Sequence, residues 1–144
     1  MEMKISMDVE RSAEDVFAYL SDVKNNFDWE KEVVEMEYTS EGPVGIGSTG
    51  RRVEKFMGTE ESTWEITEYE ENKHVAVTFA SAKFQGDLRW DLEPTDGGTR
   101  VKYQIRGRQK GLVSKLLMPL FMPMAKRQVR RNFDCLKRIL EIQK

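Results

Sequence analysis

The chain has 144 residues, of which 39% are hydrophobic and 33% are charged, and its formal net charge is −2. This composition supplies one domain with enough apolar material for its own core, and no apolar run approaches the roughly 18 residues that cross a membrane. Acidic residues at Glu2, Asp8 and Glu10 argue against a signal peptide. We therefore expect a single cytoplasmic domain over residues 1–144.

Metal and cofactor chemistry are not expected from the residue types present. The chain has one cysteine, Cys135, and one histidine, His74. One cysteine cannot form an intramolecular disulfide, and one of each residue cannot supply the ligands of an ordinary zinc site. The sequence therefore predicts neither a metal nor a cofactor.

The N-terminal part of the chain is predicted to form a strand, a helix and a second strand. Residues 3–9 alternate apolar and polar side chains with a period of two, which is typical of a strand with one buried face. Ser12 can cap a short helix that ends near residue 20, and residues 21–22 can begin another turn. Alternation over residues 34–39 predicts the second strand.

Residues 45–50 read Gly-Ile-Gly-Ser-Thr-Gly and match the G-x-G-x-x-G pattern of dinucleotide-binding proteins. In that motif the pyrophosphate lies at the N-terminus of a helix that follows the glycines. Residues 51–58 lack an apolar stripe with helical spacing and end at Gly58, so we expect another strand there. We therefore expect no dinucleotide to bind.

Alternation continues to residue 106 and predicts about seven strands in an antiparallel meander, with a hairpin turn at 94–99. Residues 112–125 are almost wholly apolar, and residues from 126 onward have the amphipathic spacing of a long helix. Pro119 and Pro123 are expected to kink this helix or to divide it.

This order of elements resembles the START-like helix-grip superfamily, also called SRPBCC, and within it the polyketide cyclase/dehydrase-like branch. The resemblance covers the whole chain and rests on VERSAEDVFAYLSDVKNNFDW, SEGPVGIGSTG, WDLEPTDGGTRVKY and the closing LKRILE. It implies an α+β fold in which a seven-stranded sheet curls around a long C-terminal helix, with two short helices after the first strand. It also implies a deep and mostly apolar cavity between the sheet and the helix.

The cavity wall can be predicted by assuming that strand faces with large apolar residues point inward. For each of these residues ordinary core packing is the alternative. The predicted ligand-binding residues are Met36, Tyr38, Trp64, Phe79, Phe84, Trp90, Tyr103, Met118, Phe121, Met122, Val129 and Phe133.

Charged candidates for the cavity lie on the strand that follows the glycines. If Val53 faces inward, Arg51 does too, whereas if Phe56 faces inward, Arg52 and Glu54 accompany it. A cavity arginine would suit a ligand with a carboxylate or enolate head. The alternative is that these groups lie in solvent at the strand end.

Charge is distributed unevenly along the chain. Residues 1–99 hold 10 Lys or Arg against 23 Asp or Glu, and residues 100–144 hold 13 against 2. The basic part could be a solvated helix face, or residues 112–131 could make transient contact with an anionic membrane. We do not expect nucleic acid to be its partner.

Three functions fit the sequence. The leading prediction is a carrier that binds an apolar small molecule or lipid in the cavity. The alternative is a polyketide cyclase/dehydratase-like enzyme that uses the same cavity without metal or nucleotide, and a third is an interaction module that uses the basic C-terminal helix.

Overall fold

The computed structural model describes residues 1–56 and 58–142. Met57, which the sequence places on the strand after the glycines, lies outside the described residues. The helices are α1 (Ala13–Ser21), η1 (Val23–Asn25, a 3-10 turn), α2 (Asn26–Trp29) and α3 (Leu112–Ile142). The strands are β1 (Glu2–Val9), β2 (Val33–Tyr38), β3 (Thr49–Lys55), β4 (Thr59–Glu70), β5 (His74–Ser81), β6 (Phe84–Thr95) and β7 (Gly98–Gln109).

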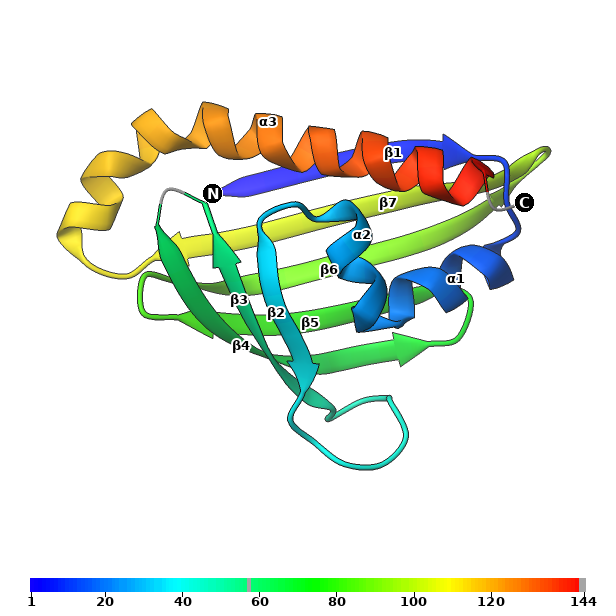
Figure 1. Cartoon of the computed structure of the whole chain (residues 1–144), viewed down its shortest axis with the longest axis horizontal. Helices are drawn as coiled ribbons and strands as arrows, with labels where there is room; N and C mark the ends of the chain where they lie inside the picture. The colour runs from blue at the N-terminus through cyan, green and yellow to red at the C-terminus, as the bar shows by residue number, and fades with distance from the viewer. Residues whose placement is uncertain (57, 143–144) are drawn as a thin grey trace.

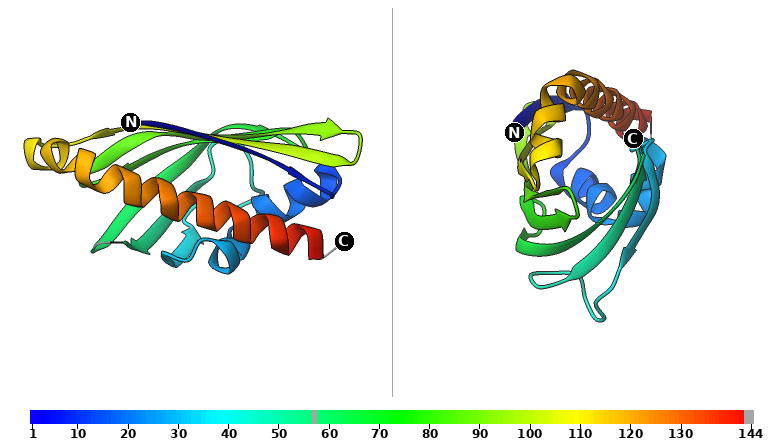
Figure 2. Two further views of the ribbon diagram at one scale, coloured as in Figure 1. Left: turned by 90° about the horizontal axis from the view of Figure 1, so that it is seen from above. Right: turned by 90° about the vertical axis from the view of Figure 1, so that its left-hand side faces the viewer.

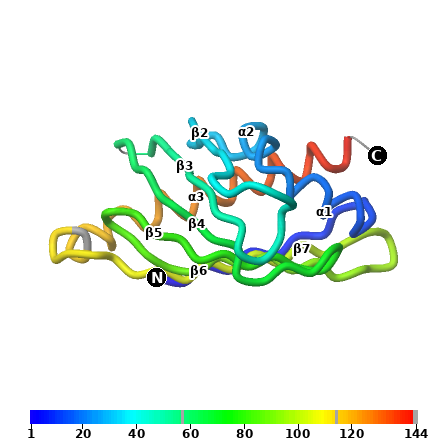
Figure 3. The backbone as a smooth tube through the Cα atoms, turned by 90° about the horizontal axis from the view of Figure 1, so that it is seen from below, coloured from blue at the N-terminus to red at the C-terminus, as the bar shows by residue number. Residues whose placement is uncertain are grey.

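The seven strands form one antiparallel sheet in the order β1-β7-β6-β5-β4-β3-β2. Register shifts in β4, between Ile66 and Glu68, and in β2, between Val33 and Glu35, add to the strand twist and curl the sheet. The sheet curves around an interior that α3 crosses (Figures 1 and 2). Seen from below, β2 and β3 stand away from β6 and β7 (Figure 3). The predicted helix-grip fold is confirmed.

The core lies between the inner sheet face and the second half of α3. Phe133, Leu136 and Leu140 recur with helical spacing and are buried together with Val16 of α1. The ring of Trp29 packs edge-on against Phe133 with centroids 5.4 Å apart. These contacts join α2 and α3 and close one side of the interior.

The helix α3 is a single element that contains both prolines. Its first turns bend away from the axis of the remainder, which extends along the sheet (Figure 1). Each proline removes one backbone donor and crowds the preceding turn. Of the two outcomes expected from sequence, a kinked helix describes the structure and a divided one does not.

The glycine segment is a strand connection, and two of its glycines have identifiable steric roles. Gly47 has a φ of +92°, a conformation that residues with a Cβ rarely adopt. Gly50 lies within β3, and a Cβ there would come within 1.9 Å of the Trp64 ring. Because β3 follows the glycines directly, they do not begin the helix that a phosphate-binding loop requires.

Candidate functional site

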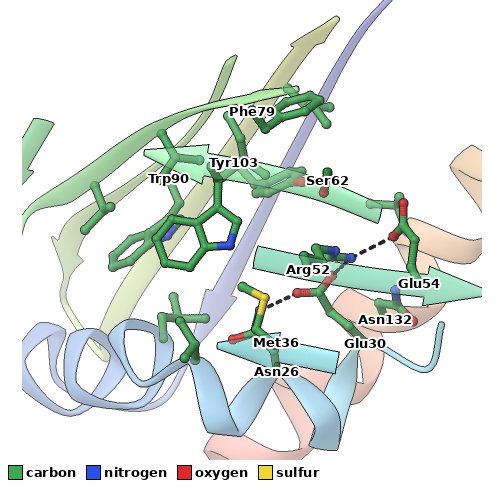
Figure 4. A pocket seen from close by; sticks show the side chains of 18 of the residues that line it. Asn26, Glu30, Met36, Arg52, Glu54, Ser62, Phe79, Trp90, Tyr103 and Asn132 are labelled. Carbon is green, nitrogen blue, oxygen red and sulfur yellow. Dashed lines mark hydrogen bonds and ion pairs between the residues drawn. The ribbon is translucent and has the colours of Figure 1, made fainter. Parts of the chain in front are cut away.

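A cavity of about 350 Å³ lies between the inner face of the sheet and the second half of α3. Its volume is at the lower end of the range of small-molecule sites. Most of its wall is apolar or aromatic, and Figure 4 shows Phe79, Trp90 and Tyr103 on one side of it. Eight residues predicted from sequence line it: Met36, Tyr38, Trp64, Phe79, Trp90, Tyr103, Val129 and Phe133.

Four residues predicted to bind ligand are not part of this wall. Phe84 shares the inward parity of Trp90, but it is the first residue of β6, at the end of the sheet beyond the cavity. Met118, Phe121 and Met122 belong to the first half of α3, which extends away from the sheet and does not cover it (Figure 1). The apolar character of that half had suggested a cavity wall, but most of it is surface.

The first half of α3 exposes large apolar side chains. Leu116 and Leu120 each keep 69% of their surface accessible. The other exposed apolar residues in this half are Leu112, Val113, Leu117 and Met124. The exposed side chains of this half therefore form an apolar surface next to the basic residues 126–131.

The structure settles which arginine of β3 enters the cavity. Arg52 and Glu54 line the cavity with Phe56, whereas Arg51 and Val53 lie on the opposite face of the strand. On that outer face Arg51 forms ion pairs with glutamates of β2 and β4. Of the two orientations expected from sequence, the structure therefore has the one in which Phe56, Arg52 and Glu54 face inward.

Arg52 is surrounded by the carboxylates of Glu30, Glu32 and Glu54, and we call these four residues the inner cluster; Figure 4 shows Arg52 with Glu30 and Glu54. Its Nη2 lies 2.6 Å from Glu30 Oε2, 3.0 Å from Glu54 Oε2 and 3.6 Å from Glu32 Oε1. Asn132 of α3 donates from Nδ2 to both oxygens of Glu32 at 2.9 Å. The inner cluster thus ties β3, α3 and the segment after α2 together at one end of the cavity.

Further amides complete the hydrogen bonding of the carboxylates. Gln128 Nε2 donates to Glu32 at 3.3 Å, and Asn26 Nδ2 donates to Glu30 at 2.5 Å. The Arg52 atoms Nε and Nη1, by contrast, have no hydrogen-bond acceptor among residues 1–56 and 58–142. The carboxylates are well supplied with donors, and the guanidinium keeps two nitrogens, with three N–H donors, unused.

The arginine and the tyrosine at this end both keep their protons at neutral pH. Burial lowers the pKa of Arg52, but the ion pairs with Glu30 and Glu54 more than offset this and raise it above its ordinary value. Burial raises the pKa of Tyr103 well above 10.0, and the negative charge of Glu30 raises it further. Tyr103 is therefore a neutral hydroxyl whose ring packs 4.8 Å from that of Phe133.

The second predicted tyrosine, Tyr38, has its hydroxyl already engaged. It donates to the backbone carbonyl of Ser21 at 3.3 Å, and burial raises the pKa of the phenol. Its ring packs edge-on against Trp64 at 5.3 Å. Tyr38 therefore contributes mainly an aromatic wall, whereas the hydroxyls of Tyr103 and of Tyr69, which also lines the cavity, have no hydrogen-bond partner in the described chain.

The sequence did not predict Glu30 and Glu32 of the inner cluster. It also did not predict Gln128 and Asn132, which donate hydrogen bonds to Glu32. Glu30 and Glu32 follow a helix of only four residues, and no periodicity marks them. Asn132 did leave a signal, because it interrupts the apolar stripe three residues after Val129 and four before Leu136. A buried polar residue in an apolar stripe needs a polar partner, and here that partner is Glu32.

The amino-acid sequence that forms this cavity matches a known protein family. Residues 1–141 match the family model described as "Polyketide cyclase / dehydrase and lipid transport". The chain belongs to this family. No curated protein sequence matches the chain.

Three solved structures with a similar fold come from bacteria. A protein from Thermus thermophilus is 18% identical, with a TM-score of 0.81 over 96% of this chain and 95% of that one. A conserved protein from Geobacillus kaustophilus is 15% identical, with a TM-score of 0.77 over 97% and 95%. The Aha1 dimer from Colwellia psychrerythraea is 18% identical, with a TM-score of 0.69 over 100% and 98%. At these identities the likeness concerns the fold alone.

Proposed function

We propose that the protein binds an apolar small molecule or lipid in the cavity and acts as a carrier or binding protein. The observation that carries this proposal is an apolar and aromatic cavity of about 350 Å³ with polar groups gathered at one end. Such a site gains affinity from the apolar wall and orientation from a few polar groups. The family description includes lipid transport, which agrees with this role.

The raised pKa values of the polar groups support binding over proton transfer. Tyr103 and Arg52 both hold their protons far above neutral pH, so they donate hydrogen bonds and do not act as bases. A cyclase or dehydratase needs a group whose protonation changes near its working pH. Tyr103 and Arg52 are therefore suited to hydrogen bonding with a ligand, which supports binding as the function.

A cavity-filling variant tests the proposal. Ser62 lines the cavity on β4, and its neighbour Thr63 lies on the outer face of the same strand. Ser62→Phe should lower the affinity for the neutral fluorescent probe N-phenyl-naphthylamine by roughly tenfold or more, because the ring takes up ligand volume. Thr63→Phe should leave that affinity unchanged.

Two results would contradict carrier function. One is that the wild-type protein does not bind the probe and native mass spectrometry of detergent-free protein finds no copurified ligand. The other is that Ser62→Phe and Thr63→Phe bind the probe equally well while both remain folded.

We further propose that residues 112–131 make transient contact with an anionic membrane when ligand is exchanged. This segment contains five Lys or Arg and no Asp or Glu, and it carries the exposed leucines of α3. Apolar residues beside basic ones fit the interface of an anionic bilayer. A second copy fits less well, because pairing two such segments brings like charges together. Among the described residues, no helix is long and apolar enough to cross a membrane.

Vesicle co-sedimentation tests the membrane contact. The protein should sediment with vesicles of phosphatidylglycerol and phosphatidylcholine and stay in solution with phosphatidylcholine alone. Leu116→Ser combined with Leu120→Ser should reduce the bound fraction by roughly tenfold, because two apolar side chains no longer enter the bilayer. Ile46→Ser is the matched control, since Ile46 is 73% exposed in the loop on the opposite side of the molecule from α3 (Figure 1). Binding that is independent of anionic lipid, or equal loss in both variants, would contradict the contact.

A further inference from the structure

The polar end of the cavity carries more negative than positive charge. The inner cluster brings three carboxylates to one guanidinium, so its formal charge is +1 − 3 = −2. Among the described residues, no Lys or Arg other than Arg52 pairs with Glu30, Glu32 or Glu54. The arginine that would attract an anionic ligand is thus already outnumbered by carboxylates.

Burial gives this excess charge a larger effect than it would have on the surface. The Arg52 side chain keeps 20% of its surface accessible, and those of Glu30 and Glu32 keep 12% and 10%. Charges interact more strongly where water is partly excluded. Tyr103 senses the same field, because Glu30, Glu54 and Glu32 raise the pKa of its phenol and only Arg52 lowers it.

The hydrogen-bond donors at this end nevertheless need an acceptor. The Tyr103 hydroxyl and the Arg52 atoms Nε and Nη1 have no acceptor within the described part of the chain. A carbonyl, ether or hydroxyl oxygen can accept from them without adding a negative charge. A carboxylate can also accept, but it would come close to three other carboxylates.

We propose that the cavity selects apolar ligands whose polar end is an uncharged oxygen acceptor, and that the inner cluster rejects ligands with a carboxylate or another anionic head. This inference rests on the proposed binding function. It reverses the expectation that an arginine in the cavity favours a carboxylate or enolate. Specificity here comes from a repulsive element, the excess glutamates, as well as from the donors.

A matched pair of ligands tests the selection. Decanol and decanoate share an apolar chain and differ in the charge of the head, and each can displace N-phenyl-naphthylamine from the wild-type protein at neutral pH. Decanol should bind at least about tenfold more tightly than decanoate, a difference of roughly 1.4 kcal/mol. The comparison is made below the concentration at which either compound forms aggregates.

A charge variant assigns the selection to the inner cluster. Glu54→Gln removes one excess carboxylate from the cluster member with the most exposed side chain, at 37%. It should raise the affinity for decanoate by roughly threefold or more and change that for decanol by less than about twofold. Glu61→Gln is the matched control, because Glu61 faces outward beside Arg51, and it should change neither affinity. Thermal unfolding confirms that both variants are folded.

The possible results distinguish a failure of the proposed ligand selection from a failure of the proposed binding function. If decanoate binds as tightly as decanol, or if Glu54→Gln leaves their ratio unchanged, the selection is wrong and the binding function stands. If neither compound nor the probe binds, the binding function is wrong and the selection falls with it.

Discussion

Two clusters of one arginine and three glutamates lie on opposite faces of β3. The outer cluster pairs Arg51 with Glu35 at 2.9 Å, with Glu37 at 3.5 Å and with Glu61 at 2.8 Å. The inner cluster pairs Arg52 with the carboxylates of Glu30, Glu32 and Glu54. Their composition is the same, and their arginines are neighbours in the chain.

Burial and geometry distinguish the two clusters. The outer glutamate side chains keep 56%, 61% and 57% of their surface accessible, so water screens them. Arg51 also uses a different nitrogen for each carboxylate, whereas Arg52 gathers all three around Nη2. Exposure therefore decides what such a cluster does. The outer one is a solvated surface, and the inner one can shape the ligand site and the stability of the fold.

The largest difference between the clusters should appear when each arginine is removed. Arg52→Met leaves the largely buried carboxylates of Glu30 and Glu32, and the more exposed one of Glu54, without their cation and should lower the free energy of unfolding by about 3–5 kcal/mol. Arg51→Met removes ion pairs that water already screens and should cost much less. Urea unfolding of both variants measures the difference. Equal losses would show that burial does not distinguish the clusters.

The sequence predicted most of the fold because the fold follows from local periodicity. The alternation in residues 3–9 and 34–39 and the apolar stripe from Val129 to Leu140 each match the elements of the structure. The alternation of side chains along a strand leaves two possible orientations for residues 51–56. In the structure Arg52 faces the cavity. Periodicity could not choose between the two orientations, since the apolar residues Val53 and Phe56 have opposite parities.

The parts of the site that were missed depend on contacts distant in sequence. Glu32 and Asn132 are 100 residues apart, and their contact follows from the path of α3 across the sheet. The apolar first half of α3 predicts a cavity wall, whereas most of its side chains are exposed. The amino-acid composition of a helix does not show whether the helix extends beyond the sheet that it packs against.

A smaller effect is expected at Asn132, whose side-chain amide supports the inner cluster and has no counterpart in the outer cluster. Asn132 keeps only 3% of its surface accessible and donates to both oxygens of Glu32. Asn132→Ala should lower the free energy of unfolding by about 1–3 kcal/mol, because a buried carboxylate loses donors. Combining it with Glu32→Gln should recover part of the loss, since the unpaired charge is then gone. Additive losses in a double-mutant cycle would contradict the coupling.

The smallest effect concerns alkaline pH and tests the raised pKa of Tyr103, which is due first to burial and then to the charges of the inner cluster. The pKa of this phenol is raised above 10.0 in the folded protein, so above that pH the unfolded state releases the proton more readily. The stability that Tyr103 contributes is therefore present below pH 10.0 and is lost as the pH rises toward the folded-state pKa. Tyr103→Phe should show a shallower fall in stability above that pH, as measured by urea unfolding at a series of pH values.

Tyr19 provides the control for this pH dependence. Burial and the neighbouring Asp28 raise the pKa of Tyr19 to about 12, in the same direction as for Tyr103 but outside the inner cluster. Tyr19→Phe should therefore flatten the alkaline fall less than Tyr103→Phe does, and some slope should remain in either variant. If Tyr103→Phe and the wild-type protein lose stability in parallel, the inner cluster does not act on this phenol. The excess carboxylates would then also be too well screened to reject an anionic ligand at the same end of the cavity.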